Sequence, residues 1–545
     1  MNRLTKLHAT RAHRPWCGEP GEIVTTLFED VLAALGDAGD DSLLRSARRG
    51  IEKESLRITP LGRLAQTAHP RALGSALTHG SITTDYSEAL LEFITGVHDG
   101  LAGALDELDR IHRFVHEQIG EELLWAVSMP CVLERGEDIP VARYGSSNVA
   151  HMKTVYRLGL GWRSGRLMQT IAGVHYNFSF GDVFWEWLHA RAGSTLTLRD
   201  FKTERYFGLI RNFHRNAWLL IYLFGASPAL CSSFVQGREH RLQRLGKGTL
   251  YLPFGTSLRM GDLGYQSSAQ HSIDISYNSL DEYVEALRRA IREPHPDYVR
   301  IGVREGEVWR QLNTSLLQIE NEFYASIRPK RVARSGESPR HALAERGVEY
   351  IEVRCLDLDP FEPVGIAPAT AHFLDAFLLC CLLQPSPPSD VADRRIAREN
   401  LLAVVERGRD PQLRLRRADG SEATLRELGE ALLVDIAAAG ELLDRAHHDH
   451  ACATSIAAQR DRLRDPELTP SARVLAAVRD SGESFFHFAM ERSRVHREHF
   501  LSRPLDAPSH AEFARLASES LARQATLEAA DTLSFEQYLA NYYAQ

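Results

Sequence analysis

Residues 347–359, GVEYIEVRCLDLD, place a carboxylate and a guanidinium side by side on one face of a predicted strand. Alternate residues of a strand point to opposite faces, so Glu352 and Arg354 lie on one face. That face also carries Tyr350 and Leu356, and the opposite face carries Ile351, Val353 and Cys355. The second face is typical of a strand that covers a core. The first face suits binding of a divalent cation or a phosphate group.

Three further segments show a similar alternation of polar and apolar side chains. Their polar faces consist of Glu52 and Glu54 in residues 50–58, of His175, Asn177 and Ser179 in residues 173–180, and of Gln318, Glu320, Glu322 and Tyr324 in residues 316–324. Each face taken alone is also explained as the solvated side of an antiparallel sheet. Together they favour Glu, His, Asn and Arg, which suit hard cations and phosphate. If Glu52, Glu54 and Glu352 converge, they repel one another unless a cation lies between them.

Residues 78–96, THGSITTDYSEALLEFITG, add two acidic candidates. Asp85 is placed to cap a helix over YSEALLEFI, with Glu88 at the third helical position as in a capping box. A structural role and a chemical role for Asp85 are therefore equally open. Glu92 interrupts the apolar run ALLEFI, and a carboxylate buried there requires a partner.

The motifs of several common enzyme classes are missing. The sequence contains no G-x-x-x-x-G-K-[ST], G-x-G-x-x-G, H-E-x-x-H or G-x-S-x-G motif. The histidine clusters HHDH (447–450) and HREH (496–499) lie in polar helical segments, and we interpret them as solvated helix faces rather than metal sites.

Composition excludes some classes of protein. The formal net charge of −8 argues against a nucleic-acid-binding protein, and the 545 residues are 44% hydrophobic, enough for a large core. The longest apolar run, AWLLIYLFGA, is too short to span a membrane, which takes about 20 residues, and predicts a buried core helix. The seven cysteines are scattered without a C-x-x-C motif, which indicates reduced thiols and a cytoplasmic location.

The sequence pattern divides the chain into a body of mixed helices and strands and a helical C-terminal region. Helical periodicity is expected at 21–47, 101–119, 198–224 and 368–383, and strand-like alternation at 50–58, 173–180, 311–324 and 347–359. The linker QPSPPSD (384–390) precedes predicted helices at 421–448, 469–480 and 508–530. We therefore predict an α+β fold with a basic N-terminal extension and helix (1–45), a catalytic body (46–385) and a mostly helical C-terminal region packed on it (386–545).

Eight segments, in order between about residue 45 and residue 385, resemble the bacterial glutamate–cysteine ligases (γ-glutamylcysteine synthetases). They are HPRALGSALTHGSITTDYSEALLEFIT, YGSSN, LMQTIAGVHYNFS, YLFGASPALCSSF, TSLRMGDLGY, QIENEFYASIRPKR, RSGESP and GVEYIEVRCLDLDPF. The resemblance implies a glutamine synthetase-like fold, in which a curved antiparallel sheet forms a funnel-shaped active site with helices outside. It also implies ATP-dependent joining of the γ-carboxylate of L-glutamate to the amine of L-cysteine, with Mg²⁺ or Mn²⁺, as the first step of glutathione biosynthesis.

The resemblance also assigns roles to individual residues. The implied metal ligands are Glu52, Glu54, Asp85, Glu92, His175 and Glu352, and Arg354 reaches the transferred phosphate beside Glu352. Gln169 and Arg259 are implied to hold glutamate, and the cysteine pocket is implied to consist of Tyr86, Tyr156, Leu160, Tyr265 and Tyr324. The family pattern has Phe where this chain has Tyr86, which leaves the polarity of that wall open.

The expected mechanism proceeds through a γ-glutamyl phosphate, with L-glutamate, L-cysteine and ATP as the only partners. We expect a monomer that binds neither nucleic acid nor membrane. An alternative is another ATP-dependent glutamate–amine ligase of the same fold with a different amine. Alternatives of other classes are a phosphotransferase of related fold, which would form no amide, and a non-catalytic metal-binding protein.

Overall fold

The computed structural model of this chain describes residues 24–545 except 38, 131–132, 134–135, 264–272 and 335. At its centre lies a seven-stranded sheet in which every pairing is antiparallel. The strand order is β11 (Ile327–Lys330), β12 (Tyr350–Leu356), β5 (Val174–Ser179), β1 (Arg48–Ile58), β3 (Leu90–Ile94) and β2 (Ile82–Thr84), with β4 (Leu123–Leu124) paired to β1. Strands distant in sequence are thereby neighbours, and β1 and β12 both pair with β5.

One face of the sheet covers the main hydrophobic core. Ile51 in β1, Tyr176 in β5 and Val353 in β12 are completely buried on that face. The helices α3 (Leu101–Gln118) and α6 (Leu198–Phe224) pack against the sheet, and α10 (Pro368–Leu383) packs against both helices. The opposite face carries the polar side chains and is left free to line a cavity.

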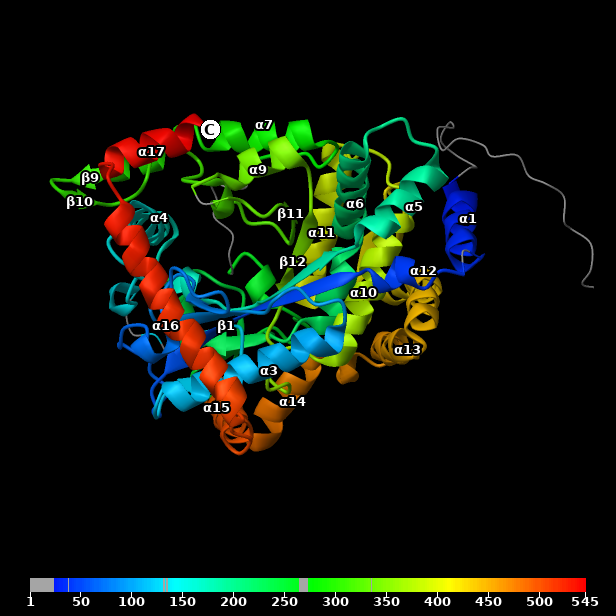
Figure 1. Ribbon diagram of the computed structural model, residues 1–545. Helices are drawn as coiled ribbons and strands as arrows, with labels where there is room; N and C mark the ends of the chain where they lie inside the picture. Colours follow the sequence, from blue (N-terminus) through cyan, green and yellow to red (C-terminus); the bar gives the residue numbers. More distant parts are fainter. Residues whose placement is uncertain (1–23, 38, 131–132, 134–135, 264–272, 335) are drawn as a thin grey trace, which may run out of the picture.

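The remaining helices surround this centre (Figure 1). They are α1 (Val24–Asp37), α2 (Ser42–Arg45), α4 (Asn148–Ser164), α5 (Asp182–Ala192), α7 (Leu280–Ala290), α8 (Pro296–Ile301), α9 (Pro339–Arg346), α11 (Val391–Arg407), α12 (Leu425–His447), α13 (Ala451–Arg464), α14 (Pro470–Ser481), α15 (Phe485–Leu501), α16 (Ala507–Ala530) and α17 (Phe535–Ala544). Short strands form a three-stranded sheet, β6 (Ala229–Cys231), β8 (Thr249–Tyr251) and β7 (Gln243–Leu245), and two hairpins, β9 (Arg304–Glu305) with β10 (Val308–Trp309) and β13 (Arg414–Arg416) with β14 (Glu422–Thr424).

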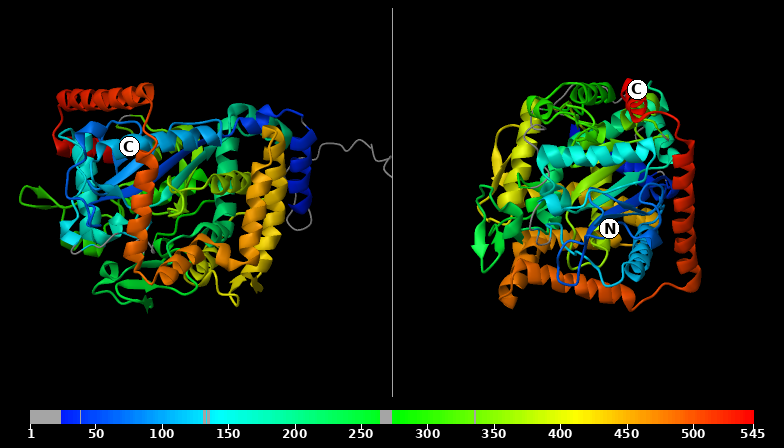
Figure 2. Two further views of the ribbon diagram at one scale, coloured as in Figure 1. Left: turned by 90° about the horizontal axis from the view of Figure 1, so that it is seen from below. Right: turned by 90° about the vertical axis from the view of Figure 1, so that its left-hand side faces the viewer.

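The helices beyond the 384–390 linker lie against the rest of the molecule. The helix α11 packs along α6, and α12 and α13 pack along α10. The long helix α16 then runs along one edge of the molecule from α15 to α17 (Figure 2, right). Within the part of the chain that the structure describes, no helix has both the length and the apolar character needed to cross a membrane.

Several expected elements are confirmed. The helices expected at 101–119, 198–224 and 368–383 are α3, α6 and α10, and the apolar run AWLLIYLFGA forms the buried end of α6. The α+β fold with a central antiparallel sheet and outer helices is also confirmed. The five cysteines among the described residues are free thiols and are buried, at positions 231, 355, 380, 381 and 452.

Two expected elements are wrong. The segment YSEALLEFI does not form a helix capped by Asp85, because Leu90–Ile94 is strand β3 and pairs with both β1 and β2. Cross-strand pairing and burial on both sides outweigh the helix-like spacing of its leucines. The expected strand at 311–324 is absent, and only a short 3-10 helix, Glu320–Glu322, forms there. Its two acidic side chains are buried by ion pairs with Arg340 and Arg163 rather than arranged on a sheet face.

The interpretation of the two histidine clusters is wrong at one position. His496, in helix α15, is only 7% exposed. The other four histidines of the two clusters are half-buried or exposed, at positions 447, 448, 450 and 499.

Candidate active site

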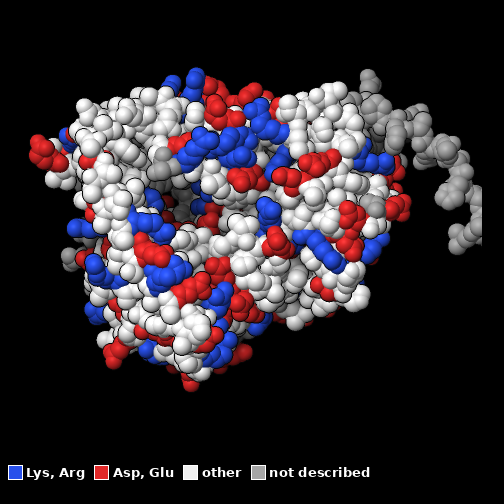
Figure 3. Space-filling model, in the orientation of Figure 1, with Lys and Arg blue, Asp and Glu red and all other residues white. Residues whose placement is uncertain are grey.

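A cavity of about 1010 Å³ lies over the polar face of the central sheet. It is lined from β1, β3, β5 and β12, from helix α4 and from the segment 319–324. The space-filling view is hollowed to the left of its centre, and Lys and Arg side chains gather above the hollow (Figure 3).

The register of the strands brings the acidic side chains together. Glu54 in β1 stands directly opposite Glu92 in β3, and Glu52 in β1 stands opposite His175 in β5. Glu352 in β12 pairs with Asn177 on the other side of β5. Four neighbouring strands thus contribute to one polar strip, although their residues are up to 300 positions apart (Glu52 to Glu352).

The closest group within this strip has the composition of a cation site. Glu52, Glu92 and His175 each offer one ligand atom, and these atoms lie within 4.8 Å of one another. His175 Nδ1 lies 3.1 Å from Glu52 Oε2 and 3.8 Å from a carboxylate oxygen of Glu352. The Asn177 amide donates a 2.9 Å hydrogen bond to Glu52 and fixes its orientation. Carboxylate and imidazole groups are ordinary ligands of divalent cations in proteins.

Electrostatics show that the acids are crowded. Burial and the nearby charge of Asp85 raise the pKa of Glu54 to about 8, and burial with the charges of Glu52, Asp85 and Glu54 raises the pKa of Glu92 well above its ordinary value. A cation bound in the cavity would favour the ionised forms of Glu54 and Glu92. In addition, Glu352 Oε2 is buried and accepts no hydrogen bond from the described residues, although Lys330 Nζ lies 3.4 Å away. The residues present therefore fit a divalent cation.

Glu352 is held among cationic groups at one end of the strip. Its carboxylate lies 3.0 Å from Arg354 Nη1 and 3.4 Å from Lys330 Nζ. Burial opposes ionisation of Glu352, but Lys330 and Arg354 together keep its pKa well below the ordinary value. Arg354 thus lies beside Glu352 as the strand pattern predicted, and Lys330 adds a second cation from β11.

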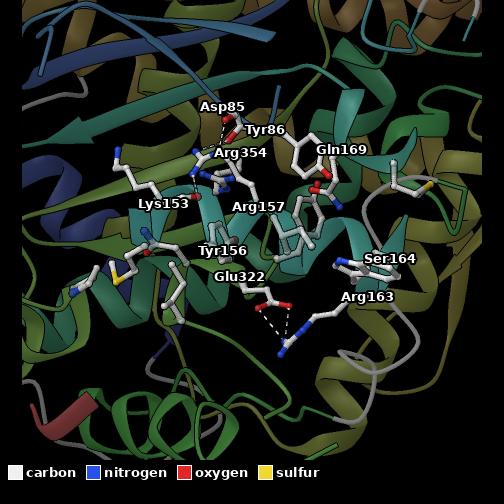
Figure 4. Close-up of a pocket in the computed structure, with 18 of the residues that line it drawn as sticks. Asp85, Tyr86, Lys153, Tyr156, Arg157, Arg163, Ser164, Gln169, Glu322 and Arg354 are labelled. Atoms are coloured by element: carbon white, nitrogen blue, oxygen red, sulfur yellow. Dashed lines mark hydrogen bonds and ion pairs between the residues drawn. The ribbon is translucent and has the colours of Figure 1, made fainter. Parts of the chain in front are cut away.

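The residues expected to form an amino-acid pocket line the same cavity. Tyr156 and Leu160 project from α4, and Tyr86 and Tyr324 approach from the loops after β2 and before β11. Tyr265 lies outside the described residues. Figure 4 shows Tyr86, Tyr156, Gln169 and Arg354 around the same space. The Tyr86 hydroxyl is buried and forms no hydrogen bond with the described residues, and it would lie 2.5 Å from a Cβ at Gly161, so it points at helix α4.

Arg259 and Gln169 also line this cavity. Arg259 is 1% exposed and donates a 2.9 Å hydrogen bond to the carbonyl oxygen of Arg354. Gly173 makes this approach possible, because a Cβ there would lie 2.2 Å from the Arg259 guanidinium. The structure therefore brings together all the described candidates, although Glu54, Asp85 and Glu352 lie outside the compact group of three ligands.

Comparison with known proteins now decides the family. The family model described as "Glutamate-cysteine ligase" matches residues 32–404. The chain belongs to the glutamate–cysteine ligase family. Among its relatives, the glutamate–cysteine ligase of Alcanivorax borkumensis is 52% identical over 95% of this chain and 99% of its own length. That of a Janthinobacterium species is 50% identical over 95% of this chain and 98% of its own.

Solved structures of relatives agree with the family fold. A glutamate–cysteine ligase from Francisella tularensis, crystallised in complex with AMP, is 38% identical and covers 92% of this chain and 98% of its own, with a TM-score of 0.85. A bifunctional glutathione synthetase from Pasteurella multocida is 23% identical and covers 90% of this chain and 58% of its own, with a TM-score of 0.70. The second likeness supports the fold alone. The resemblance stated from the sequence is thereby confirmed.

Sequence reasoning missed several side chains of this family member's cavity. Lys153 and Arg157 lie one turn apart on α4 and flank Tyr156, a spacing that points all three toward one side of a helix. Arg163 forms a buried ion pair with Glu322, at 3.1 Å, on the cavity wall (Figure 4). Lys330 lies in the segment SIRPKR, and a lysine at the end of a strand does not by itself indicate a binding site. Two tyrosines of α17 also reach the cavity, and nothing in their local sequence indicates it.

Proposed function

We propose that this chain joins the γ-carboxylate of L-glutamate to the amine of L-cysteine, with hydrolysis of ATP to ADP and phosphate. The observation that carries this proposal is the single cavity that combines a strip of crowded carboxylates, the cations Arg354 and Lys330, and an aromatic wall. The family membership and the names of the relatives support the same reaction. The product is γ-glutamylcysteine, the precursor of glutathione.

The carboxylate strip is proposed to hold Mg²⁺ or Mn²⁺. Glu52, Glu92 and His175 form its compact part, and Glu352, Glu54 and Asp85 complete the set. When bound, these cations neutralise the triphosphate of ATP and the charge that develops during phosphoryl transfer. The fit rests on the chemistry of the donor set and on the buried Glu352 Oε2, which accepts no hydrogen bond from the described residues.

The side chains of this chain supply binding and positioning in both chemical steps. Arg354 and Lys330 are proposed to bind oxygens of the transferred phosphoryl group, because both already face the Glu352 carboxylate. Arg259 and Gln169 are proposed to hold glutamate with its γ-carboxylate toward that phosphoryl group. An oxygen of the γ-carboxylate attacks the γ-phosphorus, and ADP leaves. The first step thus yields a γ-glutamyl phosphate.

In the second step the amine of cysteine attacks the acyl carbon, loses a proton and expels inorganic phosphate. The cysteine side chain is proposed to lie among Tyr86, Tyr156, Leu160 and Tyr324, with Tyr265 as a further member of this pocket. Sulfur packs favourably against aromatic rings, with a contribution of about 0.3–1.5 kcal/mol. The aromatic wall therefore distinguishes a small thiol from a charged or long amine substrate.

Other parts of the proposal concern the whole chain. We propose a cytoplasmic monomer whose catalytic body is residues 46–385 and whose partners are glutamate, cysteine and ATP alone. Free buried thiols at all the described cysteines agree with a reducing compartment. Residues 386–545 are proposed as a helical region that packs on the body.

The proposal is tested by measuring ADP release with glutamate and cysteine each omitted in turn. We expect ADP release to require both amino acids and to match the amount of γ-glutamylcysteine found by mass spectrometry. Turnover with glutamate and a different amine, but not with cysteine, would replace the proposal by another glutamate–amine ligase. A stable phosphorylated product without an amide would indicate a phosphotransferase.

A further inference from the structure

The last helix, α17, forms part of the wall of the active-site cavity, although it begins at residue 535 and the last strand that carries an acid of the strip ends at residue 356. Two of its side chains, Tyr538 and Tyr542, line that cavity. In Figure 1, α16 runs along one side of the molecule, from α15 at the bottom to α17 at the top left. A helix that contributes directly to the cavity wall can influence what the cavity binds.

An apolar cluster fixes α17 against the helix that carries Tyr156. Phe535, Leu539 and Tyr542 of α17 pack with Met152 and Val155 of α4, and with Leu312 and Ile319 of the neighbouring segment. Tyr156 itself packs against this cluster and lines the cavity. The position of the Tyr156 ring therefore depends on α17, because removal of the helix would expose one side of the cluster.

A chain of hydrogen bonds leads from α17 to the cavity wall. The Tyr543 hydroxyl donates to the carbonyl oxygen of Gln318 at 2.8 Å and accepts from the Asn313 amide at 2.8 Å. The Gln318 side chain donates in turn to the carbonyl oxygen of Tyr156 at 3.0 Å. The Gln318 backbone N–H donates to Glu322 at 2.6 Å, which is the acid paired with Arg163 on the wall.

The residues after Tyr542 bind the segment before α9 as well. Gln545 accepts a 2.7 Å hydrogen bond from the Ser338 backbone, and its side chain donates to the carbonyl oxygen of Gly336. The Tyr542 hydroxyl contacts Glu320 at 3.3 Å. The end of α17 thus ties together two loops that carry cavity-lining residues and holds them at a fixed separation.

We propose that α17 is a positioning element of the amine-substrate subsite, and that the Tyr543 hydroxyl sets the position of Tyr156 through Gln318. This inference rests on the proposed function, in which Tyr156 and Tyr324 hold cysteine. The hydrogen bonds and apolar contacts of α17 described above lead to the 311–324 segment, to the segment before α9 and to helix α4. Loss of the Tyr543 hydroxyl should therefore weaken binding of cysteine and leave binding of glutamate and ATP unchanged.

The test compares Tyr543→Phe with Asn541→Ala, a control on the exposed side of the same helix. Steady-state rates of ADP release are measured against each of the three substrates at saturating levels of the other two. We expect Tyr543→Phe to raise KM for cysteine about threefold to tenfold, the range that loss of a net hydrogen bond gives. Its KM for glutamate and for ATP, and its kcat, should stay within twofold of wild type, as should every constant of Asn541→Ala.

Hydrogen–deuterium exchange supplies a readout independent of turnover. Peptides that cover residues 311–324 should exchange faster in Tyr543→Phe than in wild type or Asn541→Ala, with the central strands unchanged. An unaltered KM for cysteine, or an equal rise in all three KM values, would overturn the inference. Failure of wild type to release ADP with glutamate and cysteine would overturn the proposed function instead, so the two failures are distinguishable.

Discussion

Replacement of Glu352 by Gln is the most informative single change in the acidic strip. The substitution keeps the size of the side chain and removes its charge. Glu352 is 1% exposed, and its carboxylate lies 3.0 Å from Arg354 and 3.4 Å from Lys330. At an effective dielectric constant of about 20, each of these contacts amounts to about 5 kcal/mol of Coulomb attraction before desolvation is subtracted. Removal of one partner from a buried pair costs about 3–5 kcal/mol overall.

The catalytic loss follows from that energy. If about 2.7 kcal/mol of it is lost from the transition state, kcat falls about 100-fold. We therefore expect Glu352→Gln to lose at least about 100-fold in kcat and to need more Mg²⁺ or Mn²⁺ for half-maximal activity. The assay is ADP release over a titration of each cation, together with circular dichroism to establish that the variant is folded.

The matched control is Glu349→Gln, a carboxylate just before the same strand with a side chain that is 43% exposed. It should behave as wild type at every concentration of cation. Near-normal activity of Glu352→Gln at ordinary Mg²⁺ would refute the assignment of Glu352 to the metal site. An unfolded Glu352→Gln protein would show that the charge of Glu352 acts through stability, which would also refute the assignment.

Three further predictions concern Arg354 and the Tyr86 side chain in the cavity. Arg354→Lys should retain more activity than Arg354→Ala but much less than wild type, since Lys lacks the planar fork; equal kcat for Arg354→Lys and wild type would show that charge alone suffices. Tyr86→Phe should leave KM for cysteine and for 2-aminobutyrate unchanged, because the hydroxyl points at α4; a rise for cysteine alone would place it on the substrate. Gly161→Ala should lower the melting temperature, because its Cβ would lie 2.5 Å from the Tyr86 hydroxyl, and adding Tyr86→Phe should restore it; no restoration would contradict this contact.

The sequence alone predicted the strands that carry most of the chemistry. Alternation of polar and apolar side chains is a local property, so the faces of Glu52, His175 and Glu352 were assigned before their strands could be placed next to one another. The structure adds the register, which sets Glu52 opposite His175 and Glu54 opposite Glu92. Register depends on pairing between segments that are distant in the chain, so it cannot be read from a single sequence.

The errors have the same physical origin. The segment around Glu92 has leucines at helical spacing, and only its pairing with β1 and β2 makes it a strand. Glu322 alternates with apolar residues as in a strand, but an ion pair with Arg163 buries it in a 3-10 turn. The contribution of α17 depends on α16, whose length carries the chain across the molecule to the cavity.

Isotope transfer from glutamate tests the central claim most directly. Glutamate labelled with ¹⁸O in its γ-carboxylate is incubated with the protein, ATP, Mg²⁺ and cysteine, and the inorganic phosphate is analysed by mass spectrometry. Formation and breakdown of a γ-glutamyl phosphate in the cavity predicts one ¹⁸O atom in each phosphate released, together with γ-glutamylcysteine in equal amount. Phosphate without the label, or label transfer that does not require Arg354 and Glu352, would contradict the account.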